Sequence, residues 1–413
     1  MTHIVVIGAG ITGVTTAYNL VQLGYQVTVL DRQFYPAMET SFANGGQLSA
    51  CNAEVWNSVG TVFKGLKWML KADAPLLVNP KPSWHKYSWM GEFIHAIGKY
   101  RENTIATTQL AIEARKYLFA MAEKESIQFD LEKRGILHFF HDKHSFETNV
   151  QTNKLLVEGG LERYSVTPEE IRDIEPTLQG KYYGGFYTPS DATGDIHKFT
   201  RGLAAACSRQ GVTFIQGAAL QAVRHLSDGI QLNIKHVDNG DDFLKADSIV
   251  VCAGVGSRDI ASMLGDRINV YPVKGYSITV HLDDETSVEG APWVSLLDEN
   301  AKIVTSRLGR DRFRVAGTAE FNGNNKDIRA DRINPLVEWT RRNFKVSTAR
   351  VTPWAGLRPM MPDMMPRVMK GKSPRVFYNT GHGHLGWTLS AVTATTVAQL
   401  VAHQYPLVKD ALA

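Results

Sequence analysis

The stretch IVVIGAGITG, residues 4–13, decides the fold of this chain. It opens with a continuous run of Ile and Val, which is typical of a parallel strand buried on both faces. Gly8, Gly10 and Gly13 follow at once in the spacing G-x-G-x-x-G. Apolar residues within 14–21 then recur on one helical face, so a strand, a glycine turn and a helix come in the order of a βαβ unit.

Each glycine of this motif has its own physical role. The first permits the tight turn, the second lets the backbone approach a pyrophosphate at the positive helix end, and the third lets helix pack on strand. Asp31 ends the next predicted strand, 23 residues beyond Gly8, where a carboxylate accepts hydrogen bonds from ribose hydroxyls. The motif therefore predicts a dinucleotide site and leaves NAD and FAD both open. The predicted contacts are Gly8, Gly10, Ile11, Thr12, Gly13, Asp31 and Arg32.

Residues 39–49, ETSFANGGQLS, bear on that choice. They put two glycines and small polar residues where a simple nicotinamide dehydrogenase would begin another helix. Such a segment can wrap a flavin with backbone amides and hydroxyls, and an ordinary polar loop explains it equally well.

Length, charge and cysteine content exclude several classes. A chain of 413 residues exceeds one typical hydrophobic core, so we expect two domains. A net charge of +4, from 45 basic and 41 acidic residues, is too balanced to indicate a nucleic-acid partner. Cys51, Cys207 and Cys252 are far apart and odd in number, which argues against a disulfide framework and for a reducing compartment.

The N-terminus lacks the features of a signal peptide, and no stretch approaches the roughly 18 uninterrupted apolar residues of a membrane span. We therefore expect a soluble or peripheral cytoplasmic protein. Residues 62–101 interleave lysines with Trp68, Trp84 and Trp89. This segment leaves open a peripheral contact with the inner face of the cell membrane, although a helix and loop with solvated lysines would look the same.

The pattern along the rest of the chain predicts an α/β fold in which one domain interrupts another. A helix over 104–125 and short strands at 135–140 and 184–189 differ from the βαβ opening, whereas 197–216 reads as a helix and strand that rejoin the parallel sheet. Four strand-like runs between 270 and 318 suggest the second domain's sheet. The predicted architecture is a Rossmann-like, doubly wound domain with an inserted α+β domain on a mixed or antiparallel sheet. The expected segments are 1–80, 190–265 and 350–413 for the first domain, and 81–189 and 266–349 for the second.

Near the C-terminus, residues 354–368 predict a stiff, proline-rich loop that holds Arg358. A guanidinium suits a carboxylate because its planar fork makes two parallel, charge-assisted bonds, although an isolated arginine is more often a surface ion pair. Residues 377–390, FYNTGHGHLGWTLS, then run from a strand through three glycines into an apolar helix. Amides at such a helix start would stabilise the negative charge of a reduced flavin. His382 and His384 form an incomplete metal set, so no metal site is predicted.

Four features together carry a family resemblance: GAGITG with Asp31, ETSFANGGQLS, WAGLRPMMPDMMP and NTGHGHLGWTLS, in this order. The chain resembles the FAD-dependent D-amino-acid oxidase superfamily, and within it the D-amino-acid dehydrogenases of the bacterial small-subunit type. The resemblance implies a discontinuous FAD domain interrupted by a substrate domain. No cysteine follows Cys252, so it implies FAD held noncovalently. Asp31 replaces the glutamate usual in much of the superfamily, and His384 occupies a variable position.

The resemblance also implies roles for individual residues. Arg358 is similar to the arginine that binds the substrate carboxylate, Tyr276 is a weaker candidate for substrate contact, and His384 completes the candidate catalytic set. Val223 is similar to a residue that holds adenine through its backbone, beside Ala253 and Gly254. The implied flavin contacts are Ser41, Asn44, Gly45, Gly46, Gln47, Leu48, Gly383, His384, Leu385, Gly386, Trp387 and Thr388.

The implied reaction is oxidative deamination of D-amino acids or D-proline-like imino acids. Arg358 would hold the carboxylate so that the Cα hydride passes to flavin N5, and hydrolysis of the imino acid would give a 2-oxo acid and ammonia. Electrons would pass to a quinone or respiratory carrier. Oxidation of glycine, sarcosine or a 2-hydroxy acid remains open, as does a non-catalytic flavoprotein scaffold.

Overall fold

The computed structural model describes residues 1–68, 76–238 and 240–407, with only the backbone of 64–68. A six-stranded sheet forms around β1 (His3–Ile7), which pairs in parallel with β2 (Gln26–Leu30) and β13 (Ser248–Val251). Beyond these lie β9 (Thr213–Ile215), β20 (Val376–Thr380) and β19 (Arg367–Lys370), of which only β19 is antiparallel to its neighbour. The predicted return of residues 212–216 to the parallel sheet is confirmed.

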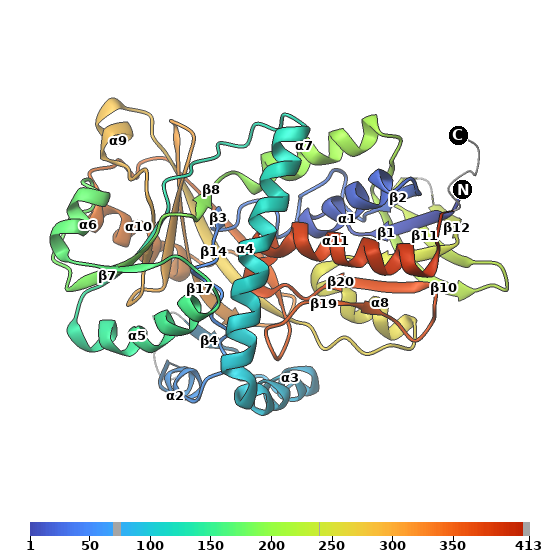
Figure 1. Cartoon of the computed structure of the whole chain (residues 1–413), viewed down its shortest axis with the longest axis horizontal. Coiled ribbons are helices and arrows are strands. Elements are labelled where there is room, and N and C mark those ends of the chain that lie inside the picture. The colour runs from blue at the N-terminus through green and yellow to red at the C-terminus, as the bar shows by residue number, and fades with distance from the viewer. Residues whose placement is uncertain (69–75, 239, 408–413) are drawn as a thin grey trace.

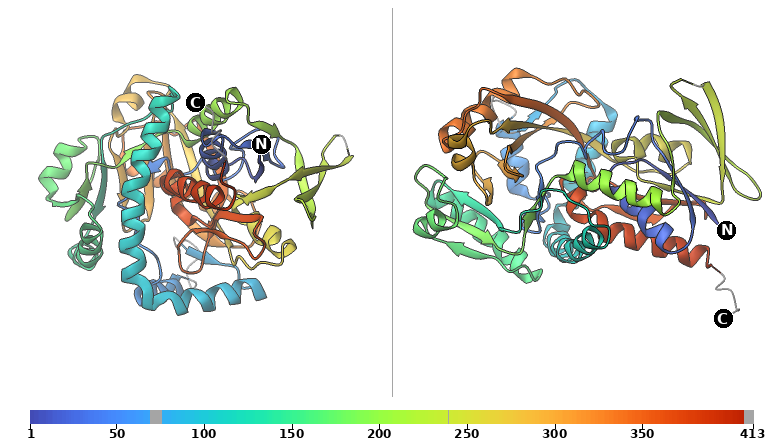
Figure 2. Two further views of the ribbon diagram at one scale, coloured as in Figure 1. Left: turned by 45° about the vertical axis from the view of Figure 1, so that its right-hand side comes forward. Right: turned by 90° about the horizontal axis from the view of Figure 1, so that it is seen from above.

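The two faces of this sheet are covered differently. Ile4 and Val6 of β1 pack against helices, whereas Val5 and Ile7 pack against a small antiparallel sheet and a short helix. The helices of the first face are α1 (Ile11–Gln22), α4 (Tyr100–Lys124), α7 (Ile196–Arg209) and α11 (Gly386–Gln404). The second face carries β10 (Ala218–His225), β11 (Ile230–His236), β12 (Gly240–Ala246) and α8 (Ser257–Met263). Figure 2 shows the three strands standing out at one end of the molecule.

A larger mixed sheet forms the other half of the molecule (Figure 1). Its strand order is β18-β14-β17-β16-β15-β5-β7-β6, with β4 paired to β17. The bounds are β4 (Leu76–Val78), β5 (Ile136–Phe140), β6 (Tyr164–Val166), β7 (Gly184–Thr188), β14 (Tyr271–His281), β15 (Ser295–Asp298), β16 (Ile303–Leu308), β17 (Arg312–Phe321) and β18 (Val351–Met360). The four runs predicted between 270 and 318 are β14 to β17, so that expectation is confirmed.

The remaining elements surround these sheets. They are α2 (Val59–Trp68), α3 (Trp84–His95), α5 (Lys143–Glu158), α6 (Pro168–Ile174), α9 (Glu285–Gly290), α10 (Ala330–Asn343), the short pair β3 (Gln47–Leu48) and β8 (Ala192–Thr193), and the 3-10 turns η1 (Ala96–Lys99), η2 (Gly254–Gly256) and η3 (Gly383–Leu385). The long helix α4 crosses the molecule between the two large sheets (Figure 1). Its bounds agree with the helix predicted over 104–125.

The structure corrects the prediction of a loop around Arg358. Residues 351–360 form strand β18, antiparallel to β14 over its whole length. Pro359, one of the prolines that suggested a loop, and Pro353 are compatible with a strand because β18 lies at the edge of its sheet, where a missing amide hydrogen costs little. Arg358 is therefore held by a sheet rather than by a loop.

Sheet membership also bears on the domain boundaries, which stay a proposal. β4 and β18 belong to the larger sheet, so residues 76–78 and 351–360 group with the substrate domain. We therefore propose a first boundary near residue 75 and a last one near residue 361, in place of 80 and 350.

One described helix is long and apolar enough to span a membrane, by length and composition alone. It covers Gly383–Gln404, and 67% of its most apolar window is buried inside the protein. It packs against α1 and α4, which is the behaviour of a core helix.

Candidate active site

A cavity of about 1090 Å³ runs between the two large sheets. Gly8, Gly10 and Asp31 line one end of it, and Arg358 lines the wall formed by β14 and β18. The cavity therefore brings together residues that the sequence placed in separate motifs.

The glycine turn at the first end is fixed by close packing. Gly8 has a φ of +113°, and a Cβ there would lie 2.6 Å from the carbonyl oxygen of Cys252. A Cβ on Gly13 would collide with the carbonyl oxygen of Gly8. A Cβ on Gly10 would meet only the Oγ of Ser41, at 3.4 Å. Gly8 and Gly13 thus hold strand and helix together, while Gly10 leaves open space at the helix start.

Asp31 supports this turn directly. Its Oδ2 accepts a hydrogen bond from the Ala9 amide at 2.5 Å, and its Oδ1 accepts one from the Gln33 amide at 2.7 Å. Burial raises the pKa of Asp31, and these two amides oppose that rise. Each oxygen keeps a further lone pair, so the carboxylate can still accept from a ribose on the cavity side.

Residues 41–47 are clamped between the glycine turn and the larger sheet. The Oγ of Ser41 accepts from the Ile11 amide at 3.0 Å. Three consecutive carbonyls of the segment accept bonds from the larger sheet: Ala43 from Ser277 at 2.8 Å, Asn44 from Arg314 at 2.8 Å and Gly45 from Ser306 at 2.7 Å. The amides of this segment are thereby kept in one arrangement along the cavity wall.

Arg358 is a half-buried cation on the cavity wall that has no counter-ion among the described residues. It lies opposite Val273 of β14, and its guanidinium occupies the space beside Gly275, where a Cβ could not fit. Its Nη1 donates to the Thr318 carbonyl at 3.1 Å, and no carboxylate in the described part of the chain pairs with it. Burial lowers its pKa to about 10. A carboxylate ligand would restore the balance of charge at this point.

His384 lies beside the same part of the cavity. Its ring stacks on Trp56, with centroids 5.0 Å apart, and its Nε2 lies 3.0 Å from the Asn52 carbonyl oxygen. Because a carbonyl only accepts, Nε2 carries the proton, which leaves Nδ1 as a buried acceptor with no partner among the described residues. Burial lowers the pKa of His384 to about 4, so the ring is neutral near neutral pH.

The two histidines of the C-terminal motif point to different partners. The Nε2 of His382 lies 2.9 Å from Thr393 Oγ1 inside α11, away from the contact that His384 makes. Within residues 1–68, 76–238 and 240–407, no three His, Cys, Asp or Glu side chains come together as metal ligands.

Of two further predicted contacts, one lies on the cavity wall and the other does not. Tyr276 lines the cavity, although it also packs into the core of the larger sheet and its hydroxyl donates to Glu320 at 2.7 Å. Its contact with substrate stays a prediction. Val223 lies beyond the cavity wall, which is formed here by Ala218 to Leu220. The adenine contact of Val223 stays a prediction. Gly13, Leu48, Leu385 and Thr388 also lie behind the wall rather than on it.

Comparison with known proteins identifies the family of this chain. The family model described as FAD dependent oxidoreductase matches residues 3–400. The chain belongs to this FAD-dependent oxidoreductase family. It is 63% identical to "D-amino acid dehydrogenase 3" of Mesorhizobium japonicum over 98% of both chains. It is 39% identical to "D-amino acid dehydrogenase" of Paramagnetospirillum magneticum, over 97% of this chain and 94% of the relative.

Solved structures of this oxidoreductase family share the fold. Glycine oxidase from Geobacillus kaustophilus superimposes with a TM-score of 0.73 at 17% identity, covering 98% of this chain and 95% of that one. L-proline dehydrogenase from P. horikoshii gives a TM-score of 0.73 at 15% identity, covering 97% and 93%. The predicted fold and the FAD cofactor are thereby confirmed.

The residues present fit FAD. The cavity volume of about 1090 Å³ lies just above the range of roughly 300–1,000 Å³ that is usual for ligand sites, which suits a dinucleotide together with a substrate. Two buried polar atoms on its wall, Trp387 Nε1 and His384 Nδ1, have no partner among the described residues. Trp387 Nε1 is a hydrogen-bond donor and His384 Nδ1 is an acceptor, so a bound flavin ring and a bound substrate would supply the partners that these atoms lack.

Sequence reasoning missed Trp56 and Thr318. Trp56 stacks on His384, and its sequence neighbours gave no signal. Thr318 has a φ of +61°, a left-handed conformation that a β-branched residue rarely adopts. Its carbonyl holds Arg358, and its Oγ1 is buried without a partner in the described structure. Only the backbone geometry reveals it.

Proposed function

We propose that this FAD-dependent oxidoreductase catalyses the oxidative deamination of D-amino acids or D-proline-like imino acids. The observation that carries the proposal is Arg358, a half-buried guanidinium that has no counter-ion in the described part of the chain and lines the same cavity as the dinucleotide cradle. The relative from Mesorhizobium japonicum supports the choice of substrate class, because 63% identity extends over nearly the whole chain.

The side chains around Arg358 have separable tasks. Arg358 binds the substrate carboxylate with two parallel hydrogen bonds and so fixes the position of Cα. His384 Nδ1 accepts a hydrogen bond from the substrate amine. This bond orients the amine so that its nitrogen lone pair is aligned with the Cα–H bond that breaks. Trp56 holds the His384 ring in place. Bound FAD supplies the two-electron acceptor for the Cα–H bond.

The test is an anaerobic titration of the purified holoenzyme. The panel contains D- and L-amino acids, D-proline, the hydroxyproline isomers, glycine, sarcosine and 2-hydroxy acids, and the readout is loss of the oxidised flavin absorbance. Bleaching by D-amino acids or D-proline and not by their L-forms is the expected result. Bleaching by 2-hydroxy acids alone would replace the amine by an alcohol substrate, and a flavin that no compound bleaches would favour a scaffold.

We further propose that electrons leave to a quinone at a membrane surface reached through α2 and α3. Phe63, Trp84 and Ile94 of these helices are exposed large apolar residues, and Trp89 and Phe93 line the cavity from the inner side. The predicted basic character is weaker than the sequence indicated. Lys86 is buried, with its Nζ bonded to the carbonyls of Asn79 and Lys81, and Trp68 and Lys71 lie outside the described side chains.

Co-sedimentation with vesicles of mixed zwitterionic and anionic lipid tests this surface. The Trp84→Ser, Phe63→Ser double variant should lose most of the vesicle-bound fraction and should keep its flavin reduction by substrate. Exposed aromatic Tyr183, in the other half of the molecule, offers the matched control Tyr183→Ser. Equal binding by all three proteins would remove the membrane proposal.

A further inference from the structure

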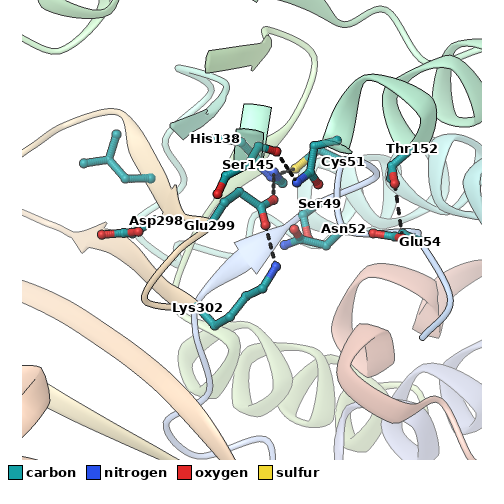
Figure 3. A network of polar contacts seen from close by, with 12 residues as sticks. Ser49, Cys51, Asn52, Glu54, His138, Ser145, Thr152, Asp298, Glu299 and Lys302 are labelled. Atoms are coloured by element: carbon teal, nitrogen blue, oxygen red, sulfur yellow. Dashed lines mark hydrogen bonds and ion pairs between the residues drawn. The ribbon is translucent and has the colours of Figure 1, made fainter. Parts of the chain in front are cut away.

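One part of the cavity wall is charged and has no role in the function proposed above. It lies between β5, α5 and the turn from β15 to β16, on the side of the cavity formed by the larger sheet (Figure 3). We name it the charged lobe. Its titratable side chains are Cys51, Glu54, His138, Arg163, Glu299 and Lys302.

Most of these groups satisfy one another. His138 contacts Cys51 Sγ at 3.1 Å through Nε2 and Glu299 Oε1 at 2.9 Å through Nδ1. The other oxygen of Glu299 pairs with Lys302 at 2.5 Å, as the dashed lines in Figure 3 show. Burial lowers the pKa of His138 to about 4, so this histidine is neutral. The negative charge of Glu299 is therefore already paired with Lys302.

Arg163 is the exception. Its side chain belongs to a residue that is only 8% exposed, its Nε is buried without a partner, and it makes no hydrogen bond or ion pair within the described part of the chain. It lies over the face of Phe186, with 5.1 Å between the guanidinium carbon and the ring centroid. Burial lowers its pKa, and the charges of nearby acidic groups, Glu299, Asp191 and Glu54 among them, oppose that shift without forming an ion pair.

The acidic groups closest to Arg163 are engaged elsewhere. Asp191 pairs with Arg115 and accepts the amides of Ala50 and Cys51. Glu54 accepts hydrogen bonds from Tyr100 at 2.6 Å and Thr152 at 3.2 Å. Burial raises the pKa of Glu54, and no hydrogen bond or ion pair joins it to Arg163 in the described part of the chain.

The charged lobe is connected to the substrate end through a short series of contacts. Arg358 acts electrostatically on His384, and His384 donates to the carbonyl of Asn52. Asn52 directly follows Cys51, whose sulfur contacts His138 in the charged lobe. The same cavity is thus lined by two guanidinium groups, Arg358 and Arg163, that have no counter-ion in the described part of the chain.

We infer that Arg163 binds the distal carboxylate of a D-amino acid with an acidic side chain while Arg358 holds the α-carboxylate. The inference rests on the proposed function and narrows its substrate class. A buried cation that faces a cavity is costly unless an anion joins it, and a carboxylate matches the geometry of a guanidinium. A side chain that ends in an amide would leave the charge of Arg163 unbalanced, so the two isosteric side chains should be distinguished.

The first experiment compares isosteric pairs in the holoenzyme: D-glutamate with D-glutamine and D-aspartate with D-asparagine. We expect kcat/KM for the acid to exceed that for the amide at least tenfold in at least one pair. In Arg163→Met this ratio should fall at least tenfold, and Arg163→Lys should retain part of the preference because it keeps the charge. Arg172→Met, an exposed arginine in the same half of the molecule, should leave the ratio unchanged.

An acid and an amide with equal kcat/KM in the unmodified enzyme would overturn the inference without any variant. A preference for the acid that persists in Arg163→Met would overturn it as well, because a group other than Arg163 would then bind the distal carboxylate. A merely structural role of Arg163 would lower the rates with both members of a pair and leave their ratio constant.

A binding measurement separates this inference from the proposed function. Glutarate has the two carboxylates of glutamate and no amine, so it can bind but cannot be oxidised. Glutarate should raise the Tm of the holoenzyme more than pentanoate does, and Arg163→Met should abolish the difference. If no D-amino acid reduces the flavin but this difference remains, the proposed reaction is rejected and the binding of a carboxylate by Arg163 is retained. If D-amino acids reduce the flavin and glutarate behaves like pentanoate, only the binding of a carboxylate by Arg163 is rejected.

Discussion

The two ends of the cavity differ in whether backbone or side chains form their walls. The dinucleotide end is made of backbone, with glycines where the chain turns and Asp31 bonded to two amides of the turn. The substrate end is made of side chains projected from β14, β17 and β18, and it holds charges that lack partners in the described part of the chain. A backbone site is specified by a short local motif, whereas a side-chain site depends on strands paired across about 80 residues of sequence. Substitutions at the two ends of the cavity should therefore impair the protein in different ways.

The largest effect is expected at the backbone end. In Gly10→Val the added side chain occupies the space at the helix start, so we expect purified protein without FAD and with its secondary structure intact. Gly10→Ala is the matched control, because its Cβ meets only Ser41 Oγ at 3.4 Å. The flavin absorbance per protein and the circular dichroism spectrum check this. A fully flavinated valine variant would contradict the placement of the pyrophosphate.

Arg358→Met tests the side-chain end and should leave FAD bound. Loss of the half-buried partner for the substrate carboxylate should lower kcat/KM by roughly 30- to 5,000-fold, which corresponds to about 2–5 kcal/mol. Steady-state kinetics with the best substrate of the anaerobic panel measures it. Arg350→Met, at an exposed arginine next to β18, is the control and should stay within about twofold. An unchanged KM in Arg358→Met would reject the carboxylate anchor.

Titratable groups of the substrate end are buried, and their burial makes the stability of the protein depend on pH. Burial lowers the pKa of His382 from 6.5 to about 4. Between these values the unfolded chain binds a proton that the folded chain does not, so the free energy of unfolding falls as the pH falls, by up to about 1.4 kcal/mol per pH unit. Removing the titration in His382→Gln should make this acid limb shallower.

Tm values recorded for the holoenzyme from pH 7 down to pH 4 compare the two proteins. His403→Gln, at the exposed end of α11, is the control and should keep the slope of the unmodified chain. Identical slopes in His382→Gln and the unmodified chain would show that His382 is not the group responsible.

The smallest effect concerns the backbone of the substrate end. The dinucleotide end places glycine at its left-handed turn, whereas Thr318 adopts a φ of +61° with a β-branched side chain. Strain of this kind costs about 1–3 kcal/mol, and glycine loses about 0.5–1 kcal/mol in chain entropy, so Thr318→Gly should gain about 1 kcal/mol of stability. Urea unfolding of holoenzyme measures the gain, with Thr305→Gly in a regular strand as a destabilised control. A loss of stability in Thr318→Gly would show that this conformation is not strained.

The dinucleotide end could be predicted from sequence because its requirements are local. The spacing of Gly8, Gly10 and Gly13 and the position of Asp31 fix a turn whose geometry does not depend on distant residues. The return of residues 212–216 to the parallel sheet was predicted from the helix and strand pattern, whereas the order of the strands was not. The helix after the C-terminal glycines was also predicted correctly.

The substrate end was predicted less well because burial and facing direction are tertiary properties. Arg358 was identified, but its strand was taken for a loop, since the prolines that mark a loop are also tolerated in an edge strand. Tyr276 was placed at the site and lines the cavity, but the sequence does not show that its hydroxyl is bonded to Glu320. Arg163 gave no signal, because a missing counter-ion can be seen only in the folded chain.

The order of strands in the six-stranded sheet also constrains how the protein is made. Its strand β1 comes from residues 3–7, whereas β20 and the helix that closes the cofactor wall come from residues 376–404. A nascent chain that emerges N-terminus first cannot complete this sheet until residues 376–404 have emerged, while β14 to β17 of the larger sheet are already available. FAD should therefore bind only after residues 376–404 have emerged, and translation products truncated before residue 376 should be unable to retain it.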